Sequence, residues 1–170
     1  MSSEQRAYLD TSALAKWYLN EVGSEAFVEF LQGLDSAVIS SLTVTEMRSL
    51  LSRRRRMGDL SVELECVLFA ALLDDIDRGW LQRYPMDDAR FGEATNLIAR
   101  YPEHPLRTLD ALHLTLAADL GVSMLATADG VMADAAVSMG LEVVAFRPVI
   151  RALLGTPSGV PSLLCRLYRT

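Results

Sequence analysis

Four carboxylates that lie far apart in the chain each mark a point where an apolar run gives way to a helix-like pattern: Asp10, Glu46, Asp110 and Asp129. The first and the last directly follow short apolar runs that are typical of buried strands. If these strands are parallel, their carboxyl ends meet at one edge of a sheet, where open α/β folds bind their ligands. We therefore expect all four side chains to converge on one crevice.

Carboxylates held this close together repel one another, and burial increases the cost of their charge. Such a cluster must take up protons or bind cations. A purely oxygen donor set suits Mg²⁺ or Mn²⁺, and Mg²⁺ typically keeps several waters. Because water activated by such a cation attacks phosphodiesters, the quartet predicts metal-dependent hydrolysis.

Each acid also has a structural explanation. Asp10 and Asp129 are suited to cap the helices that follow them, and Asp110 lies in a first turn, where a carboxylate complements the helix dipole. Glu46 completes a capping-box pattern that begins at Thr43. Four unrelated caps would not need to share one site's chain order and one sheet edge, so we favour metal binding for the set.

Other polar residues are weaker candidates. His113 lies three residues after Asp110 and shares its helix face, and we expect it to pack beneath the site. Asp134 follows on the helix after Asp129 but points elsewhere, so it is left outside the site. The run of arginines at 53–56 is interpreted as the last turn of a helix rather than as a dedicated RNA contact.

The chain alternates between strand-like and helix-like segments. The expected strands are residues 6–10, 37–40, 80–84, 122–126 and 141–146. The expected helices are residues 12–19, 24–34, 43–57, 61–79, 87–101, 108–120 and 130–139. This order predicts a three-layer α/β/α sandwich around a mostly parallel sheet of about five strands. Residues 1–146 form the expected domain, and residues 147–170 an appendage packed on it.

Composition limits the class of protein. A chain of 170 residues with 51% hydrophobic residues is large enough for one domain with a substantial core. It shows no leader and no membrane-spanning run, so we expect a soluble, cytoplasmic protein without a membrane partner. The net charge of −6 argues weakly against nucleic acid. Cys66 and Cys165 lack zinc or disulfide spacing and are expected to be buried or partly buried thiols.

Four motifs together resemble the PIN domain and, more narrowly, the VapC-type toxins of bacterial toxin–antitoxin pairs. They are Tyr8–Lys16, Ser41–Glu46, Arg107–Leu114 and the late Thr127–Asp129. The resemblance extends over residues 6 to about 146, in the family's order and with similar spacing. Each fragment alone is common, but the ordered set is specific.

The resemblance implies a metal-dependent endoribonuclease with Mg²⁺ or Mn²⁺ as cofactor. Asp10 and Asp110 would be the principal metal ligands, while Glu46 and Asp129 would hold water on the cation or a second ion. Ser12 would orient a ligand or contact phosphate. The products would carry 5′-phosphate and 3′-hydroxyl ends.

The same resemblance implies three partners: an RNA substrate, a second copy of the chain in a homodimer, and a cognate VapB-like antitoxin. The C-terminal segment of such an antitoxin wraps the toxin and pushes a basic side chain into the acidic pocket. An Arg guanidinium suits that role because it matches carboxylates in charge and geometry.

Other classes of protein compete with the nuclease. A non-catalytic PIN-like module that binds protein or RNA would not require all four acids. A phospho-accepting receiver domain would need paired acids after the first strand and a lysine after the last, but Lys16 is the only lysine of the chain. A haloacid-dehalogenase-like phosphatase would need a second aspartate where Ser12 stands.

Overall fold

The computed structural model of the chain describes residues 5–146, in which strands and helices alternate. The strands are β1 (Arg6–Leu9), β2 (Ser36–Ser40), β3 (Leu81–Tyr84), β4 (Met124–Thr127) and β5 (Glu142–Ala145). The helices are α1 (Thr11–Tyr18), α2 (Ser24–Gln32), α3 (Ser41–Arg56), α4 (Val62–Asp77), α5 (Asp88–Arg100), α6 (Thr108–Asp119) and α7 (Gly130–Ser138). Their bounds agree with the sequence prediction to within two residues.

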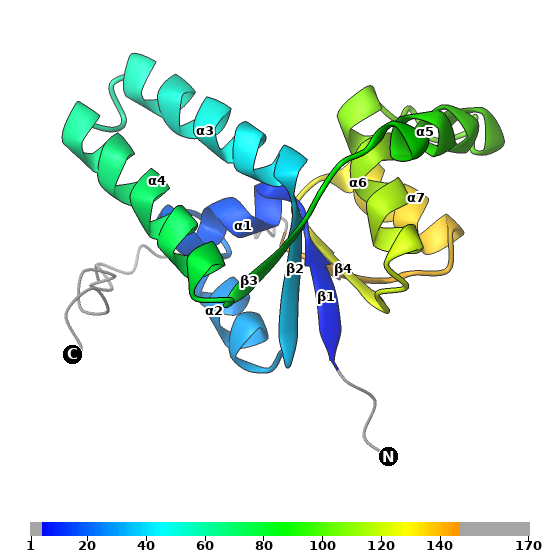
Figure 1. Ribbon diagram of the computed structural model, residues 1–170, viewed down its shortest axis with the longest axis horizontal. Coiled ribbons are helices and arrows are strands. Elements are labelled where there is room, and N and C mark those ends of the chain that lie inside the picture. The colour runs from blue at the N-terminus through cyan, green and yellow to red at the C-terminus, as the bar shows by residue number, and fades with distance from the viewer. Residues whose placement is uncertain (1–4, 147–170) are drawn as a thin grey trace, which may run out of the picture.

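The five strands of the described region form one sheet in the order β3-β2-β1-β4-β5, and every neighbouring pair is parallel. Helices α1 to α4 lie on one side of the sheet and α5 to α7 on the other (Figure 1). The predicted three-layer α/β/α architecture is therefore confirmed, and the described sheet is parallel throughout.

Strand β1 shows how the layers are built. Ala7 and Leu9 belong to the core under α1 to α4, whereas Tyr8 belongs to the core under α5 to α7. All three side chains are fully buried. A strand covered on both faces reads as a continuous apolar run, which is why residues 6–9 lack the alternation of a half-exposed strand.

The start of α3 differs from the expected capping box. Ser40, the last residue of β2, accepts a hydrogen bond from the backbone N–H of Thr43, and the Thr43 hydroxyl accepts one from the backbone N–H of Ser40. The interpretation of Thr43 to Glu46 as the box is wrong, because the helix follows the strand directly and starts two residues earlier than expected. Glu46 lies within α3 and is free for another role.

Helix α3 ends with its four arginines, as the sequence predicted. Arg54 forms ion pairs with Glu21 and Asp59, and Arg55 forms one with the buried Glu65 of α4. These two members of the run therefore hold neighbouring segments against the end of α3.

The exposure of α4 also differs from expectation. Cys66 is exposed, so its prediction as a buried thiol is wrong, and the apolar Val62 and Val67 are exposed as well. Much of the apolar surface of α4 is therefore exposed. Cys165 and the expected appendage at 147–170 lie outside the described residues. No helix within residues 5–146 combines the length and hydropathy needed to span a bilayer.

Candidate functional site

The carboxyl ends of β1, β2 and β4 lie side by side, and the candidate residues gather at this edge of the sheet. Asp10 follows β1, whose last residue pairs with Ala126 of β4, and Asp129 follows β4. Glu46 reaches the edge from α3 and Asp110 from α6. The imidazole of His113 acts to lower the pKa of Asp10, of Glu46 and of Asp110. The charge of Asp129 acts to raise the pKa of Asp110.

Asp10 is only 2% exposed and is held entirely by neutral donors. It accepts hydrogen bonds from the backbone N–H of Ala13 at 2.8 Å, from the Thr127 hydroxyl at 2.8 Å and from the Ser12 hydroxyl, which lies 2.9 and 2.8 Å from its two oxygens. Burial raises the pKa of Asp10, and the nearby His113 and these hydrogen bonds only partly oppose it. Within residues 5–146 no Lys, Arg or His forms an ion pair with this carboxylate.

Two hydroxyls join the ends of β1 and β4 around Asp10. Ser12 Oγ accepts the backbone N–H of Ala128 at 2.7 Å, and Thr127 Oγ1 accepts that of Asp129 at 2.9 Å. The Ser12 hydroxyl, expected to orient a ligand or phosphate, thus holds Asp10 in this structure. Both hydroxyls therefore fix the orientation of the buried Asp10 carboxylate.

Glu46 is tied to the site through His113. Its Oε2 accepts a hydrogen bond from the Thr11 hydroxyl and lies 2.7 Å from Nε2 of the imidazole, whose Nδ1 lies 2.7 Å from the Tyr8 hydroxyl. Burial would raise the pKa of Glu46, but the bonds from His113 and Thr11 lower it overall. His113 is 2% exposed, so it packs beneath the site as expected, and it also contacts one of the four acids.

Asp110 and Asp129 both stand at helix starts. Asp110 accepts the backbone N–H of Arg107 at 2.9 Å, and Asp129 caps α7 by accepting that of Met132 at 3.0 Å. Partial burial raises the pKa of Asp110 and the charge of Asp129 raises it further, while Arg107 opposes the shift. Capping and membership of a shared acidic site are therefore compatible.

Four helices, α1, α3, α6 and α7, begin at this edge of the sheet. The free N–H groups and the positive end of the dipole at each helix start favour negative charge nearby. They help the protein to tolerate the carboxylates, and they make the same edge suitable for a phosphate group.

The acidic edge offers only oxygen donors from its carboxylates and hydroxyls. No three His, Cys, Asp or Glu side chains in the described part of the chain lie close enough to hold a metal ion by themselves. Mg²⁺ usually takes about one or two protein carboxylates and completes its shell with water. This donor set is compatible with a hydrated Mg²⁺ or Mn²⁺ rather than with a closed protein cage.

The sequence reasoning missed three side chains of this site: Tyr8, Thr11 and Thr127. Each lies within two residues of Asp10 or Asp129, which is the only signal that the sequence contains for them. A hydroxyl so close to a carboxylate at a strand end is a candidate to orient it, which holds for Thr127 and Asp10, whereas Thr11 contacts Glu46 and Tyr8 contacts His113.

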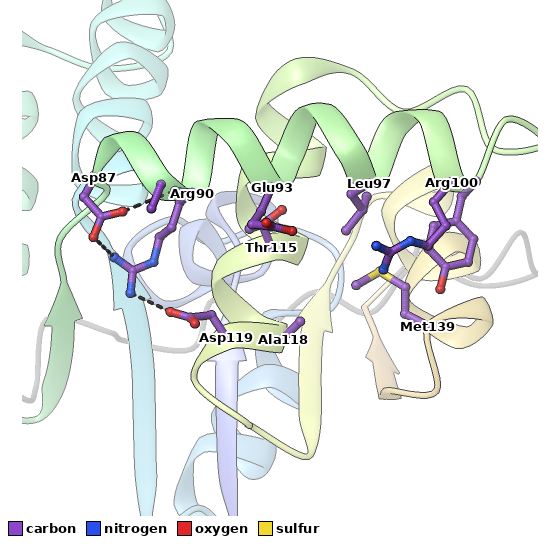
Figure 2. A pocket seen from close by; sticks show the side chains of 11 residues that line it. Asp87, Arg90, Glu93, Leu97, Arg100, Thr115, Ala118, Asp119 and Met139 are labelled. Carbon is purple, nitrogen blue, oxygen red and sulfur yellow. Dashed lines mark hydrogen bonds and ion pairs between the residues drawn. The ribbon is translucent and has the colours of Figure 1, made fainter.

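A cleft of about 640 Å³ lies between α5 and α6 and reaches Met139, the residue after α7 (Figure 2). Arg90 crosses one end of it and bonds to Asp87 at 2.8 Å and to Asp119 at 2.7 Å. None of the four acids lines it, so this cleft is not the candidate hydrolytic site.

Comparison with known proteins identifies the class of this chain. The PIN domain family model matches residues 7–138, and the chain belongs to this family. It is 32% identical over 145 residues to Ribonuclease VapC46 of Mycobacterium tuberculosis (strain ATCC 25618 / H37Rv), a match that covers 81% of this chain and 95% of the relative. The resemblance found in the sequence motifs is therefore confirmed.

Solved structures share the fold at lower sequence identity. The Mycobacterium tuberculosis VapC20, described as a Sarcin-Ricin loop cleaving toxin, has a TM-score of 0.63 and 16% identity, covering 76% of this chain and 94% of its own. VapBC2 from Rickettsia felis, bound to a DNA fragment from their promoter, has a TM-score of 0.59 and 13% identity, covering 82% and 98%. These similarities confirm the PIN-like fold.

Proposed function

We propose that this chain is the toxin of a VapBC-type pair, an endoribonuclease that hydrolyses RNA phosphodiester bonds with Mg²⁺ or Mn²⁺. The observation that carries the proposal is the buried Asp10, a carboxylate that has no ion-pair partner among residues 5–146 and that lies at an edge shared with three further acids. The similarity to Ribonuclease VapC46 supports the reaction class. RNA as substrate also makes the cytoplasm the expected compartment.

Asp10 and Asp110 are the proposed cation ligands, and Glu46 and Asp129 are proposed to orient water and any second ion. When bound, the cation supplies positive charge to the carboxylates and the phosphate and promotes ionisation of the attacking water. Ser12 keeps Asp10 aimed at the site. The helix starts attract the phosphate of the substrate, and product ends of 5′-phosphate and 3′-hydroxyl follow from attack on phosphorus with loss of the 3′ oxygen.

RNA cleavage by the full chain tests this proposal. We expect activity with Mg²⁺ or Mn²⁺, none with EDTA, and a loss of at least about 100-fold for Asp10→Asn, as is usual when a catalytic electrostatic group is removed. Asp87→Asn is the matched control, because Asp87 also caps a helix but lies away from the acidic edge. Cleavage unchanged by EDTA and by Asp10→Asn would exclude the metal mechanism.

A non-catalytic module that binds RNA or protein is the second candidate. The observation in its favour is that Asp10 and Glu46 are already held by donors of the chain itself. Such a module would bind RNA without cleaving it, whatever cation is present. A binding assay run beside the cleavage assay separates the two functions.

We also propose a homodimer and a VapB-like antitoxin as partners. VapBC2 of Rickettsia felis is described as bound to a promoter DNA fragment, which supports a second protein component for this fold. A basic side chain from such a partner would give Asp10 the ion-pair partner that it does not have within residues 5–146. Co-purification with the product of the adjacent open reading frame, and the mass of the free chain by light scattering, test these two proposals.

A further inference from the structure

One buried imidazole joins three of the elements that build the acidic edge. His113 belongs to α6, contacts Tyr8 of β1 through Nδ1 at 2.7 Å and contacts Glu46 of α3 through Nε2 at 2.7 Å. Its ring lies edge-on to the Tyr8 ring, with centroids 5.7 Å apart. Strand β1 leads into Asp10, and α6 carries Asp110. A small shift of β1, α3 or α6 would therefore change the contacts of the His113 ring.

The acceptor groups decide where the hydrogen atoms lie in the contacts that join Tyr8, His113 and Glu46. A carboxylate oxygen only accepts, so a bare Nε2 facing Glu46 would place two lone pairs against each other. Nε2 therefore carries the hydrogen and donates to Oε2. Tyr8 is fully buried and keeps its hydroxyl hydrogen, which Nδ1 can accept.

The two oxygens of Glu46 are in different situations. Oε2 is occupied by both His113 and the Thr11 hydroxyl, whereas Oε1 has no hydrogen-bond partner among residues 5–146. Two donors on one oxygen, coming from different elements, fix the rotation of the carboxylate. Only Oε1 remains for a ligand.

We propose that His113 is a positioning residue for Glu46: together with Thr11 it occupies Oε2, so that Glu46 offers a single, fixed oxygen to the acidic edge. The role of that oxygen in hydrolysis rests on the function proposed above, whereas the fixing of the carboxylate is a property of the folded chain alone. In metal sites, a side chain behind a metal ligand commonly holds that ligand in its orientation.

The fixing of Glu46 is tested by ¹⁵N NMR of the histidine rings in the full, metal-free chain. The sequence contains two histidines, so His104→Gln assigns the signals of His113. We expect a protonated Nε2 whose resonance shifts in Glu46→Ala, and an Nδ1 resonance that shifts in Tyr8→Phe. A bare Nε2, or one that does not respond to Glu46→Ala, would overturn the proposal without any assay of activity.

The consequence for hydrolysis is tested by cleavage kinetics. His113→Leu keeps an apolar side chain in the core but removes the donor, and kcat should fall about 10–100-fold, as is typical for loss of such a partner. His113→Gln restores an N–H donor and should recover most of the loss. Combined with Glu46→Ala, His113→Leu should add no further loss, because both changes remove the same interaction.

Thr11→Val provides a second variant in case His113→Leu does not fold, since it removes the other donor to Oε2. It should lower kcat in the same direction. Wild-type kcat in a folded His113→Leu, or full additivity with Glu46→Ala, would overturn the positioning role. Absence of cleavage by the wild-type chain would instead contradict the proposed function, and the NMR result would still decide whether His113 fixes Glu46.

Discussion

The buried carboxylate of Asp10 is energetically unfavourable in its charged form. Its carboxylate is removed from water and receives only neutral hydrogen bonds, so its charged form is disfavoured, and burial raises its pKa. Asp110 has a raised pKa as well, from partial burial and from Asp129. When both carboxyls are charged, they lower the stability of the fold at this edge of the sheet.

This instability predicts a pH dependence. A carboxyl whose pKa is higher in the folded than in the unfolded state makes the folded state bind more protons, so its contribution to stability is full below the ordinary value of 3.8 and is lost as pH rises through the folded pKa. In EDTA, Asp10→Asn should therefore gain stability relative to wild type as pH rises from about 4 to 7. Urea unfolding at a series of pH values measures this difference.

The comparison between the two proteins isolates Asp10, because other carboxyls titrate equally in both. Asp87→Asn serves as control, since this exposed cap has no buried charge to relieve. A wild-type minus Asp10→Asn difference that stays constant with pH would show that Asp10 titrates alike in the folded and unfolded states.

At the scale of helices and strands, local sequence signals predicted most of what the structure shows. Strand ends, glycine stops and apolar periods placed each described element within two residues. The start of α3 was misplaced because two serines at its start suit both strand and cap, so the true cap at Ser40 was hidden by a second pattern at Thr43. The contact of His113 with Glu46 joins residues far apart in the chain, and no local pattern reports it.

The α3–α4 pair depends on a buried acid. Glu65 of α4 accepts a hydrogen bond from Ser52 and forms ion pairs with Arg48 and Arg55, all on α3, and these interactions lower its pKa. Glu65→Ala should destabilise the chain at neutral pH, because it leaves both guanidinium groups without this acceptor. Hydrogen exchange should accelerate first in α3 and α4.

The pH dependence of Glu65 has the opposite sign to that of Asp10. Its stabilising effect is present above the unfolded pKa and is lost as pH falls through the lowered folded pKa. Urea unfolding of Glu65→Ala should therefore converge with that of wild type in acid. A difference that persists unchanged in acid would assign the effect to packing rather than to charge.

The turn between α1 and α2 requires a glycine because of its backbone conformation. Gly23 has a φ of 92°, and a Cβ there would lie 3.4 Å from the carbonyl oxygen of Phe146 and 3.6 Å from carbons of the Lys16 side chain. Gly58 has a φ of 85° and open space around it. Both substitutions should cost about 1–2 kcal/mol from the left-handed backbone, because the added methyl group at Gly23 meets only ordinary van der Waals contacts. A markedly larger loss for Gly23→Ala in chemical unfolding would show that the methyl group is crowded there.

For the molecule as a whole, the proposed RNA substrate would bring further negative charge to an acidic protein. The chain has a net charge of −6 and gathers acids at one edge, so RNA can approach that edge only where positive charge offsets it. Helix starts supply a part of it, and we propose that cations supply the rest. On this proposal, the fold brings together carboxylates that are unfavourable alone and that a bound cation would stabilise.

Cation binding should therefore stabilise the whole domain. A ligand that binds only the folded state, at about 100 times its Kd, adds about 2.7 kcal/mol to the free energy of unfolding. Thermal unfolding near neutral pH should show this gain with Mg²⁺ or Mn²⁺ in wild type and in Asp87→Asn, and not in Asp10→Asn. NaCl at matched ionic strength controls for screening, which acts on all exposed charges alike. The gain should diminish in acid, where protons replace the cation at Asp10, and an equal gain in all three proteins would place the cation elsewhere.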